Sequence, residues 1–309
     1  TIEGVVIDVD KLVALQFPIV DIGAVAVSVG GSMFGGGVSA SLIAGVVKLD
    51  IDGNIIPSTD TTTDVVDTVF YAGIEGGFSF GGLSGFEIRL GLSEFGPLSV
   101  YFKASIPVVI VPPYGITLTN FRAGVRFGAT LPSITDPLEL RGEAFQPAQD
   151  LTAEQWLDQM KAQIVNFAGA DCDWLDMLSN IVIEGGATLY TQYLSQVTFN
   201  ADIDILLSTD GKFLINARAN FFDNSLSMTM RMYADLSEIA AGNVTILFLA
   251  DIPDSPRVIT LRGSIEFLFS RTDGQEVTAE NQADAFEIRI TGGIDMNLVA
   301  SFVTATLEG

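Results

Sequence analysis

The chain has 309 residues, and its 38 acidic residues against 15 basic ones give a net charge of −23 without a single histidine. Its mean hydropathy is nevertheless positive, at +0.42. The lack of histidine excludes every histidine-dependent triad or metal site, and the acidity argues against partners such as nucleic acid and anionic lipid headgroups.

The first predicted elements lie in a charge-free stretch from Ile22 to Val47. This stretch is long enough for a membrane helix, but its glycine clusters and the alternation AVAVSV disfavour one. We therefore predict two strands, about 22–30 and 38–51, around a glycine-rich turn. The next segment, LDIDGNII, predicts a hairpin turn, and the polar run 58–64 predicts an exposed loop.

Strand-like segments rich in β-branched and aromatic residues then follow one another, separated by glycine, proline and turn signals such as STDGK and FDNS. Pro112 and Pro113 must lie at a sheet edge or in a turn, because proline cannot donate to a ladder. The pattern predicts a mainly β fold. We expect a large antiparallel meander, either sandwich- or barrel-like or a curved open sheet, with one helical insert near 151–179.

The insert begins with LTAEQWLDQMKAQIVNFAG, residues 151–169, which is predicted to be helical. Thr152 and Gln155 have the spacing of a capping box, and Leu151 and Trp156 that of a hydrophobic staple. Gly169 would end the helix, and a shorter helix is predicted at DWLDMLSN. One apolar stripe, more typical of core packing than of a partner-binding face, contains Trp156, Met160, Ile164 and Phe167.

The insert divides the chain into a β half at 1–140, a linker and helix at 141–180, and a second β half at 181–309, unless the sheet is one continuous β domain. A short internal echo accompanies this division. The tetrapeptide FEIR occurs at Phe86–Arg89 and again at Phe286–Arg289. In both copies Glu and Arg would lie on the opposite side of a strand from Phe and Ile.

Paired aspartates are the candidate metal ligands, since alternate residues of a strand share a face. The pairs are Asp8/Asp10, Asp50/Asp52, Asp171/Asp173 and Asp202/Asp204. Asp50, Asp52 and Asn54 resemble the start of a calcium loop, but the twelfth position holds Thr61 instead of a bidentate glutamate, so a hairpin turn is the competing explanation. Asp202 and Asp204 are interpreted as the outward positions of an amphipathic strand. Calcium is the one cofactor considered.

Catalytic patterns are weak. Cys172 is the only cysteine, so no disulfide can form within the chain, and no histidine is present to activate the thiol. The glycine-rich GGSMFGGG lacks the lysine and the strand-to-helix context of a phosphate loop. We expect that the chain is not an enzyme.

Several segments, among them GGFSFGGLSGFEIRLGLSEFGPLSVYFKA and IEGGATLYTQYLSQVTFNADIDI, together resemble β-rich regions of very large, uncharacterised bacterial proteins that are secreted or surface-exposed. The resemblance extends over most of residues 70–255. It implies a bacterial extracellular or cell-surface location and a chain that is part of a longer polypeptide. The start at Thr1 instead of Met is expected of either a processed product or a segment of a longer polypeptide. It implies no active site.

Three functions remain open from the sequence. The first is a structural or interaction module of an extracellular or cell-surface assembly, which would associate with itself or with neighbouring domains. The second is a carrier that holds a lipid or another hydrophobic ligand in a curled β groove. The third is an outer-membrane β-barrel. Strands such as VTILFLA count against it, because they are apolar on both sides, whereas barrel strands alternate between polar and apolar positions.

Overall fold

The computed structural model describes most of the chain, namely residues 2–7, 20–33, 36–56, 63–80, 83–142, 151–167, 178–193, 196, 198–239, 243–269, 286–300 and 303–308. Some of the sequence-based predictions fall outside these residues: Asp8/Asp10, Asp171/Asp173, Cys172, Gly169, and most of the loop 58–64 and of DWLDMLSN.

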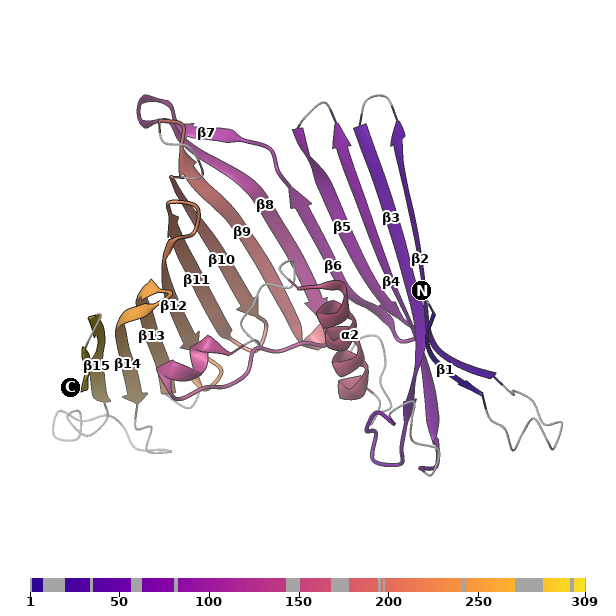
Figure 1. The fold of residues 1–309 in the computed structure, drawn as a ribbon. Coiled ribbons are helices and arrows are strands. Elements are labelled where there is room, and N and C mark those ends of the chain that lie inside the picture. The colour runs from indigo at the N-terminus through magenta and orange to yellow at the C-terminus, as the bar shows by residue number, and fades with distance from the viewer. Residues whose placement is uncertain are drawn as a thin grey trace. The chain divides into compact units, whose positions relative to one another are not determined.

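Sixteen strands in the described part of the chain form one antiparallel sheet (Figure 1). Their hydrogen-bonded order follows the sequence from β1 to β16, except that β7 pairs only with β8. The two end strands each have one neighbour in this order, so the sheet is an open meander. The strands are β1 Ile2–Ile7, β2 Val20–Met33, β3 Gly36–Leu49, β4 Asp67–Phe80, β5 Leu83–Ser93, β6 Gly96–Ala104, β7 Val108–Val111, β8 Ile116–Phe127, β9 Ile181–Thr191, β10 Phe199–Ser208, β11 Lys212–Phe221, β12 Leu226–Asp235, β13 Asn243–Asp254, β14 Arg257–Phe269, β15 Phe286–Ala300 and β16 Val303–Glu308.

The predicted mainly β meander with one helical insert is thereby confirmed, and among the forms considered the sheet is the open one. Local turn chemistry explains the reversals. In STDGK, Gly211 adopts a φ of 93°, a conformation that glycine reaches without steric cost, and its N–H donates to the carbonyl of Ser208 at 3.0 Å. Pro112 lies in the 3-10 turn η1 (Pro112–Tyr114), as its missing donor requires.

The glycine-rich segment between β2 and β3 differs in detail from the prediction. Both strands extend into it, so that Gly31 pairs with Val38 and Met33 pairs with Gly36. Glycine allows close approach here: a Cβ on Gly37 would lie 2.9 Å from Oγ of Ser79, to which the Gly37 N–H donates. These glycines are therefore part of the ladder instead of the turn.

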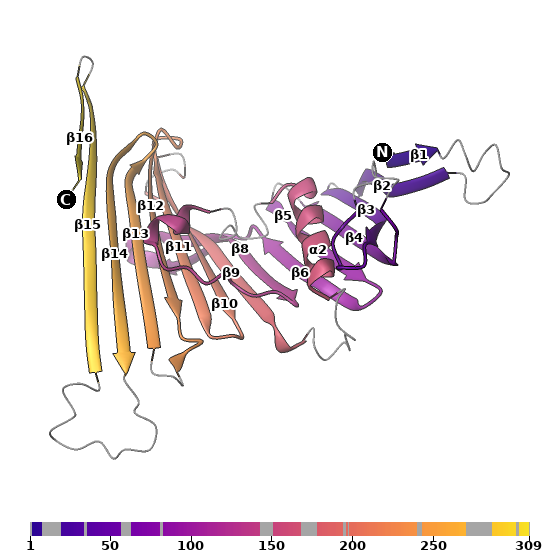
Figure 2. The ribbon, with the colours of Figure 1, turned by 90° about the horizontal axis from the view of Figure 1, so that it is seen from below.

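Helix α2, Ala153–Phe167, begins with the predicted capping box. The Gln155 N–H donates to Oγ1 of Thr152 at 3.2 Å, and the Thr152 N–H donates to Oε1 of Gln155 at 2.9 Å. The helix lies on one face of the sheet, against β4 and β6 (Figure 2). Its stripe of Trp156, Met160 and Ile164 is fully buried there, as expected of core packing.

The chain divides into two compact units. Unit 1 contains residues 1–105, 122–129 and 148–181, and unit 2 contains residues 106–121, 130–147 and 182–309. Unit 2 has a non-strand segment of its own, residues 130–142, which ends in the 3-10 helix η2 (Pro137–Arg141) and which we call the strap. Within the described ranges, no helix has both the length and the apolar character needed to cross a membrane.

Candidate functional site

The two faces of the sheet in unit 2 differ sharply in chemistry. Residues paired directly across antiparallel strands point to the same face, so the register defines rows that run from strand to strand. One row through the middle of β9 to β15 consists of Ala187, Ile203, Ala217, Met230, Ala250, Leu261 and Ile294. The next row consists of Gly185, Ile205, Ile215, Met232, Phe248, Gly263 and Gly292. We call this side the apolar face of unit 2.

Nothing in the described structure covers much of this apolar face. Ile203 is 39% exposed, Met230 is 46% exposed and Ile290 is 72% exposed. Single exposed apolar side chains are common on soluble proteins, but continuous apolar patches over several strands mark an interaction surface. The face is therefore the first candidate for a functional surface.

Unit 1 repeats this arrangement. Two of its rows across β2 to β6 consist of Val29, Ala40, Gly76, Ile88 and Phe102, and of Val27, Leu42, Ile74, Leu90 and Val100. Val29 is 69% exposed and Ile88 is 50% exposed. The apolar face of unit 1 thus resembles that of unit 2 in composition and exposure.

The opposite face of unit 2 carries the polar side chains. One complete row consists of Thr188, Asp202, Arg218, Thr229, Asp251, Thr260 and Asp295. Many of these residues are buried, Asp251 almost completely. We call this side the polar face.

This arrangement corrects one sequence-based interpretation. Asp202 and Asp204 do share a face, but Asp204 is only 5% exposed, whereas its neighbour Ile205 is 41% exposed. The strand is amphipathic, but its acidic side chains lie on the covered side and its apolar side chains on the exposed side. Hydrophobic periodicity defines two faces but does not say which of them is covered.

The strap explains why some strands are apolar on both faces. Its Leu131 and Leu140 are buried, and it lies against β13 and β14. Below it, the hydroxyl of Tyr233 donates to the carbonyl of Pro132 at 2.9 Å, and Leu247 is fully buried. The alternating leucines of VTILFLA thus pack beneath the strap on the otherwise polar face. In unit 1, α2 covers Val47 and Val69 in the same way.

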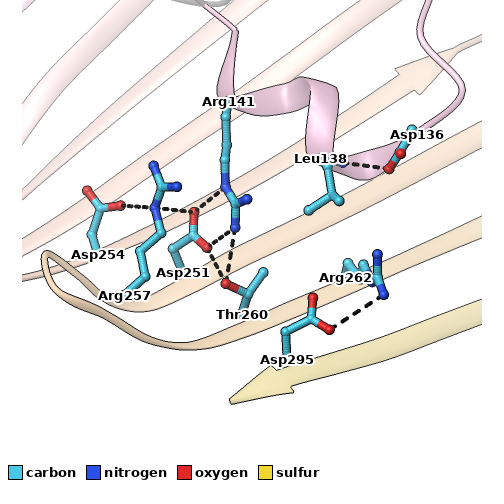
Figure 3. Close-up of polar contacts among 9 residues, drawn as sticks. All are labelled: Asp136, Leu138, Arg141, Asp251, Asp254, Arg257, Thr260, Arg262 and Asp295. Carbon is cyan, nitrogen blue, oxygen red and sulfur yellow. Dashed lines mark hydrogen bonds and ion pairs between the residues drawn. The ribbon is translucent and has the colours of Figure 1, made fainter. Parts of the chain in front are cut away.

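An arginine holds the strap to the polar face (Figure 3). Nε and Nη2 of Arg141 donate to the two carboxylate oxygens of Asp251 at 3.1 and 2.6 Å. The hydroxyl of Thr260 donates to the same carboxylate at 2.7 Å. Hydrogen bonding to Asp251 raises the pKa of Arg141, so the guanidinium stays charged. A bidentate pair of this kind fixes both position and orientation.

Further ion pairs extend from this contact (Figure 3). Nε of Arg257 lies 3.7 Å from the Asp251 carboxylate and 4.0 Å from that of Asp254. Arg262 and Asp295 pair at 3.5 Å on the adjacent strands. Sequence reasoning missed this network. Arg141 lies 110 positions from Asp251, and the pairing of β13 with β14 and of β14 with β15 brings the other members together.

The predicted calcium ligands lie in the turn after β3. Oδ1 of Asp50 accepts the N–H groups of Asp52 at 2.9 Å and of Asn54 at 2.8 Å, and Gly53 has a φ of 79°. The backbone hydrogen bond from Asn54 is the main cause that lowers the pKa of Asp50 below its ordinary value. The carboxylate thus caps the turn, which agrees with the hairpin explanation. No group of three or more acidic or cysteine side chains suited to a metal ion occurs among the described residues. Calcium binding at Asp50, Asp52 and Asn54 stays a prediction.

The two FEIR segments form similar ion pairs. Arg89 on β5 pairs with Glu75 on the preceding strand at 3.1 Å, and Arg289 on β15 pairs with Glu266 on its preceding strand at 3.2 Å. The register places Ile88 and Ile288, and in the first copy also Phe86, on the apolar face of the unit. The same local solution is therefore used in both units.

Comparisons with known proteins add no relative. No family model matches the chain, and no similar protein is found among the curated proteins or the solved structures.

Proposed function

We propose that the sheet forms part of the wall of a membrane-spanning β protein, with its apolar faces against lipid acyl chains and its polar faces toward water. One observation carries the proposal: the uncovered side of each unit is apolar along successive rows, while the charged side chains of the strands gather on the opposite side. A soluble sheet has the reverse arrangement, with its apolar face covered and its polar face in water.

The dimensions of the strands support this proposal. On β15, the five outward positions from Ile288 to Met296 are all apolar or glycine. At about 6.8 Å between alternate residues they extend for about 27 Å along the strand. With a tilt of about 40°, this length corresponds to about 21 Å of depth, close to the apolar band of about 25 Å on membrane β proteins.

The polar face is consistent with an aqueous interior. Its ion pairs and hydrogen-bonded aspartates would be costly in hydrocarbon, and the strap and α2 cover its apolar positions. A bilayer also requires that every backbone group be hydrogen-bonded. The proposal therefore requires that β1 and β16 be paired, with each other or with strands of another chain. This is the outer-membrane β-barrel considered from the sequence, located in the bacterial cell envelope.

The surface-assembly module and the hydrophobic-ligand carrier place other partners on the apolar face. In the first, another copy or a neighbouring domain would bury it, and in the second, one bound lipid would do so. Both differ from the membrane proposal in what surrounds each side chain. Accessibility to small probes therefore separates the three.

The test is a spin-label scan of β15 in protein that is reconstituted into phospholipid vesicles, with Cys172 replaced by serine. Single cysteines at Ile288 and Ile290 report the apolar face, and single cysteines at Arg289 and Thr291 serve as matched controls on the polar face. We expect high oxygen and low nickel-chelate accessibility at the two isoleucine positions, and the opposite at the two control positions.

Other results would contradict the proposal. High nickel-chelate accessibility at both isoleucine positions would show that the face is in water. Low accessibility to both probes would show that protein covers it, as in the assembly module. Failure of the folded protein to enter vesicles at all would also contradict the membrane proposal.

A further inference from the structure

A polar recess lies on the polar face of unit 2, at the end of the sheet where β8 and β10 begin. Its volume is about 370 Å³. Among the described residues, those that line it all have polar side chains: Asn120, Thr188, Gln196, Asn200, Asp202, Arg218, Asn220 and Asn224. Five of the eight are amides, so we call it the amide recess. Sequence analysis singled out only Asp202 among these residues.

Hydrogen bonds fix the orientation of the amides of Asn200 and Asn220, which form one row of the recess. Nδ2 of Asn220 donates to Oδ1 of Asn200 at 2.9 Å, and Nδ2 of Asn200 donates to the backbone carbonyl of Gln196 at 2.9 Å. The hydroxyl of Ser227 donates to Oδ1 of Asn220 at 3.0 Å. Since each amide is held by a neighbour, its remaining donor or acceptor points in a defined direction before any ligand arrives.

A second set of bonds orders the neighbouring row of the recess, which contains Thr188 and Asp202. Nδ2 of Asn120 donates to Oγ1 of Thr188 at 3.2 Å, and this hydroxyl donates to Oδ1 of Asp202 at 2.6 Å. Asn120 has a φ of 49°, and Asn224, on the turn after β11, has a φ of 62°. These are left-handed conformations that asparagine tolerates better than most residues.

The charge of the recess restricts the ligand class. The charges of its one carboxylate, Asp202, and its one guanidinium, Arg218, cancel, so the recess is neutral although the chain carries a net charge of −23. Arg218 also lies 3.8 Å from the Asp254 carboxylate, which offsets its charge further. A cation would meet a single carboxylate, and an anion would meet a single, already paired arginine. A neutral ligand fits better than either.

We infer that the amide recess binds a neutral carbohydrate of one or two sugar rings. A sugar hydroxyl both donates and accepts, and an amide presents a donor and an acceptor side by side, so adjacent hydroxyls match a set of oriented amides. The volume lies at the lower end of the range for small-molecule sites. The inference is independent of the proposed membrane location, since it concerns only the polar face.

Saturation-transfer NMR on the full chain, with glucose, galactose, N-acetylglucosamine and maltose as separate probes, tests this inference. We expect transfer to at least one sugar at millimolar concentration. Asn224→Gly keeps the left-handed backbone and removes the amide, and Gln196→Ala removes a second exposed amide. Each should weaken binding about tenfold, the value of one good hydrogen bond. Asn297→Ala, an exposed amide on β15 outside the recess, is the matched control and should leave binding unchanged.

Several outcomes would overturn the inference. One is the absence of transfer to all four sugars in folded protein. Another is equal binding by the recess variants and by the Asn297→Ala control. Competition by inorganic phosphate would assign the recess to anions instead. Thr188→Val, which keeps side-chain shape while removing a hydroxyl that lines the recess, provides a second variant if the turn variants fold poorly. None of these results bears on the spin-label scan.

Discussion

Introducing a single charged side chain on the apolar face tests whether lipid or water surrounds that face. Ile290 lies on this face of β15 and is 72% exposed. Gly292 lies at the middle of the apolar stretch, and Ile290 is the next outward position. For a strand tilted by about 40°, Ile290 therefore lies about 5 Å in depth from Gly292. In a bilayer, Ile290→Arg should reduce the free energy of unfolding by about 2–4 kcal/mol. This corresponds to about a thirtyfold to a thousandfold change in the folding equilibrium.

The measurement is urea unfolding of the protein in phospholipid vesicles, and the neighbouring Thr291→Arg is the control. Thr291 is exposed on the polar face, and its hydroxyl lies 2.5 Å from that of Ser264. Loss of that one hydrogen bond should cost about 1 kcal/mol at most. If Ile290→Arg is no more damaging than Thr291→Arg, lipid does not surround this face and the reasoning fails.

Two further predictions concern the rest of the described structure. Gly73→Ala should destabilise unit 1 by about 1–3 kcal/mol through overpacking, because the added Cβ would lie 2.9 Å from the Trp156 ring. Gly31→Ala is the control and should not destabilise the unit, because no atom lies within 4 Å of its added Cβ. Equal denaturation midpoints for the two variants would contradict this prediction. The backbone amide resonance of Asn54 should keep its hydrogen-bonded shift until pH falls below 3.8, the ordinary pKa of Asp50. The pKa of Asp50 is lowered in the folded state, so its carboxylate stays ionised and keeps the hydrogen bond at pH 3.8, and the bond is lost only as pH falls further. An NMR titration with its midpoint above 3.8 would refute the second prediction.

Local patterns predicted much of the fold. The capping box of Thr152 and Gln155 forms as expected, because it depends only on residues three positions apart. The alternation of FEIR at Phe86–Arg89 correctly separated its charged residues from its apolar ones. The glycine segment was less predictable, since only the partner strand decides whether Gly31 and Gly37 lie in a ladder or in a turn.

The candidate surfaces were the least predictable part. The amide recess joins residues of four strands with two residues outside the strands, and nothing in the spacing of Asn120 and Asn220 indicates that they line the same recess. The pair formed by Arg141 and Asp251 spans 110 positions, and only the path of the strap brings the two together.

The sequence by itself determined that this chain is a meander of strands with one more polar and one more apolar face, because side chains alternate with a period of two and glycine or proline marks the turns. Only the tertiary structure decided which face is covered. The strap and α2 pack on the side that bears the aspartates and arginines, and they leave isoleucine, valine and phenylalanine uncovered. The period of a strand is the same whichever side is covered, so the orientation depends on where distant segments pack.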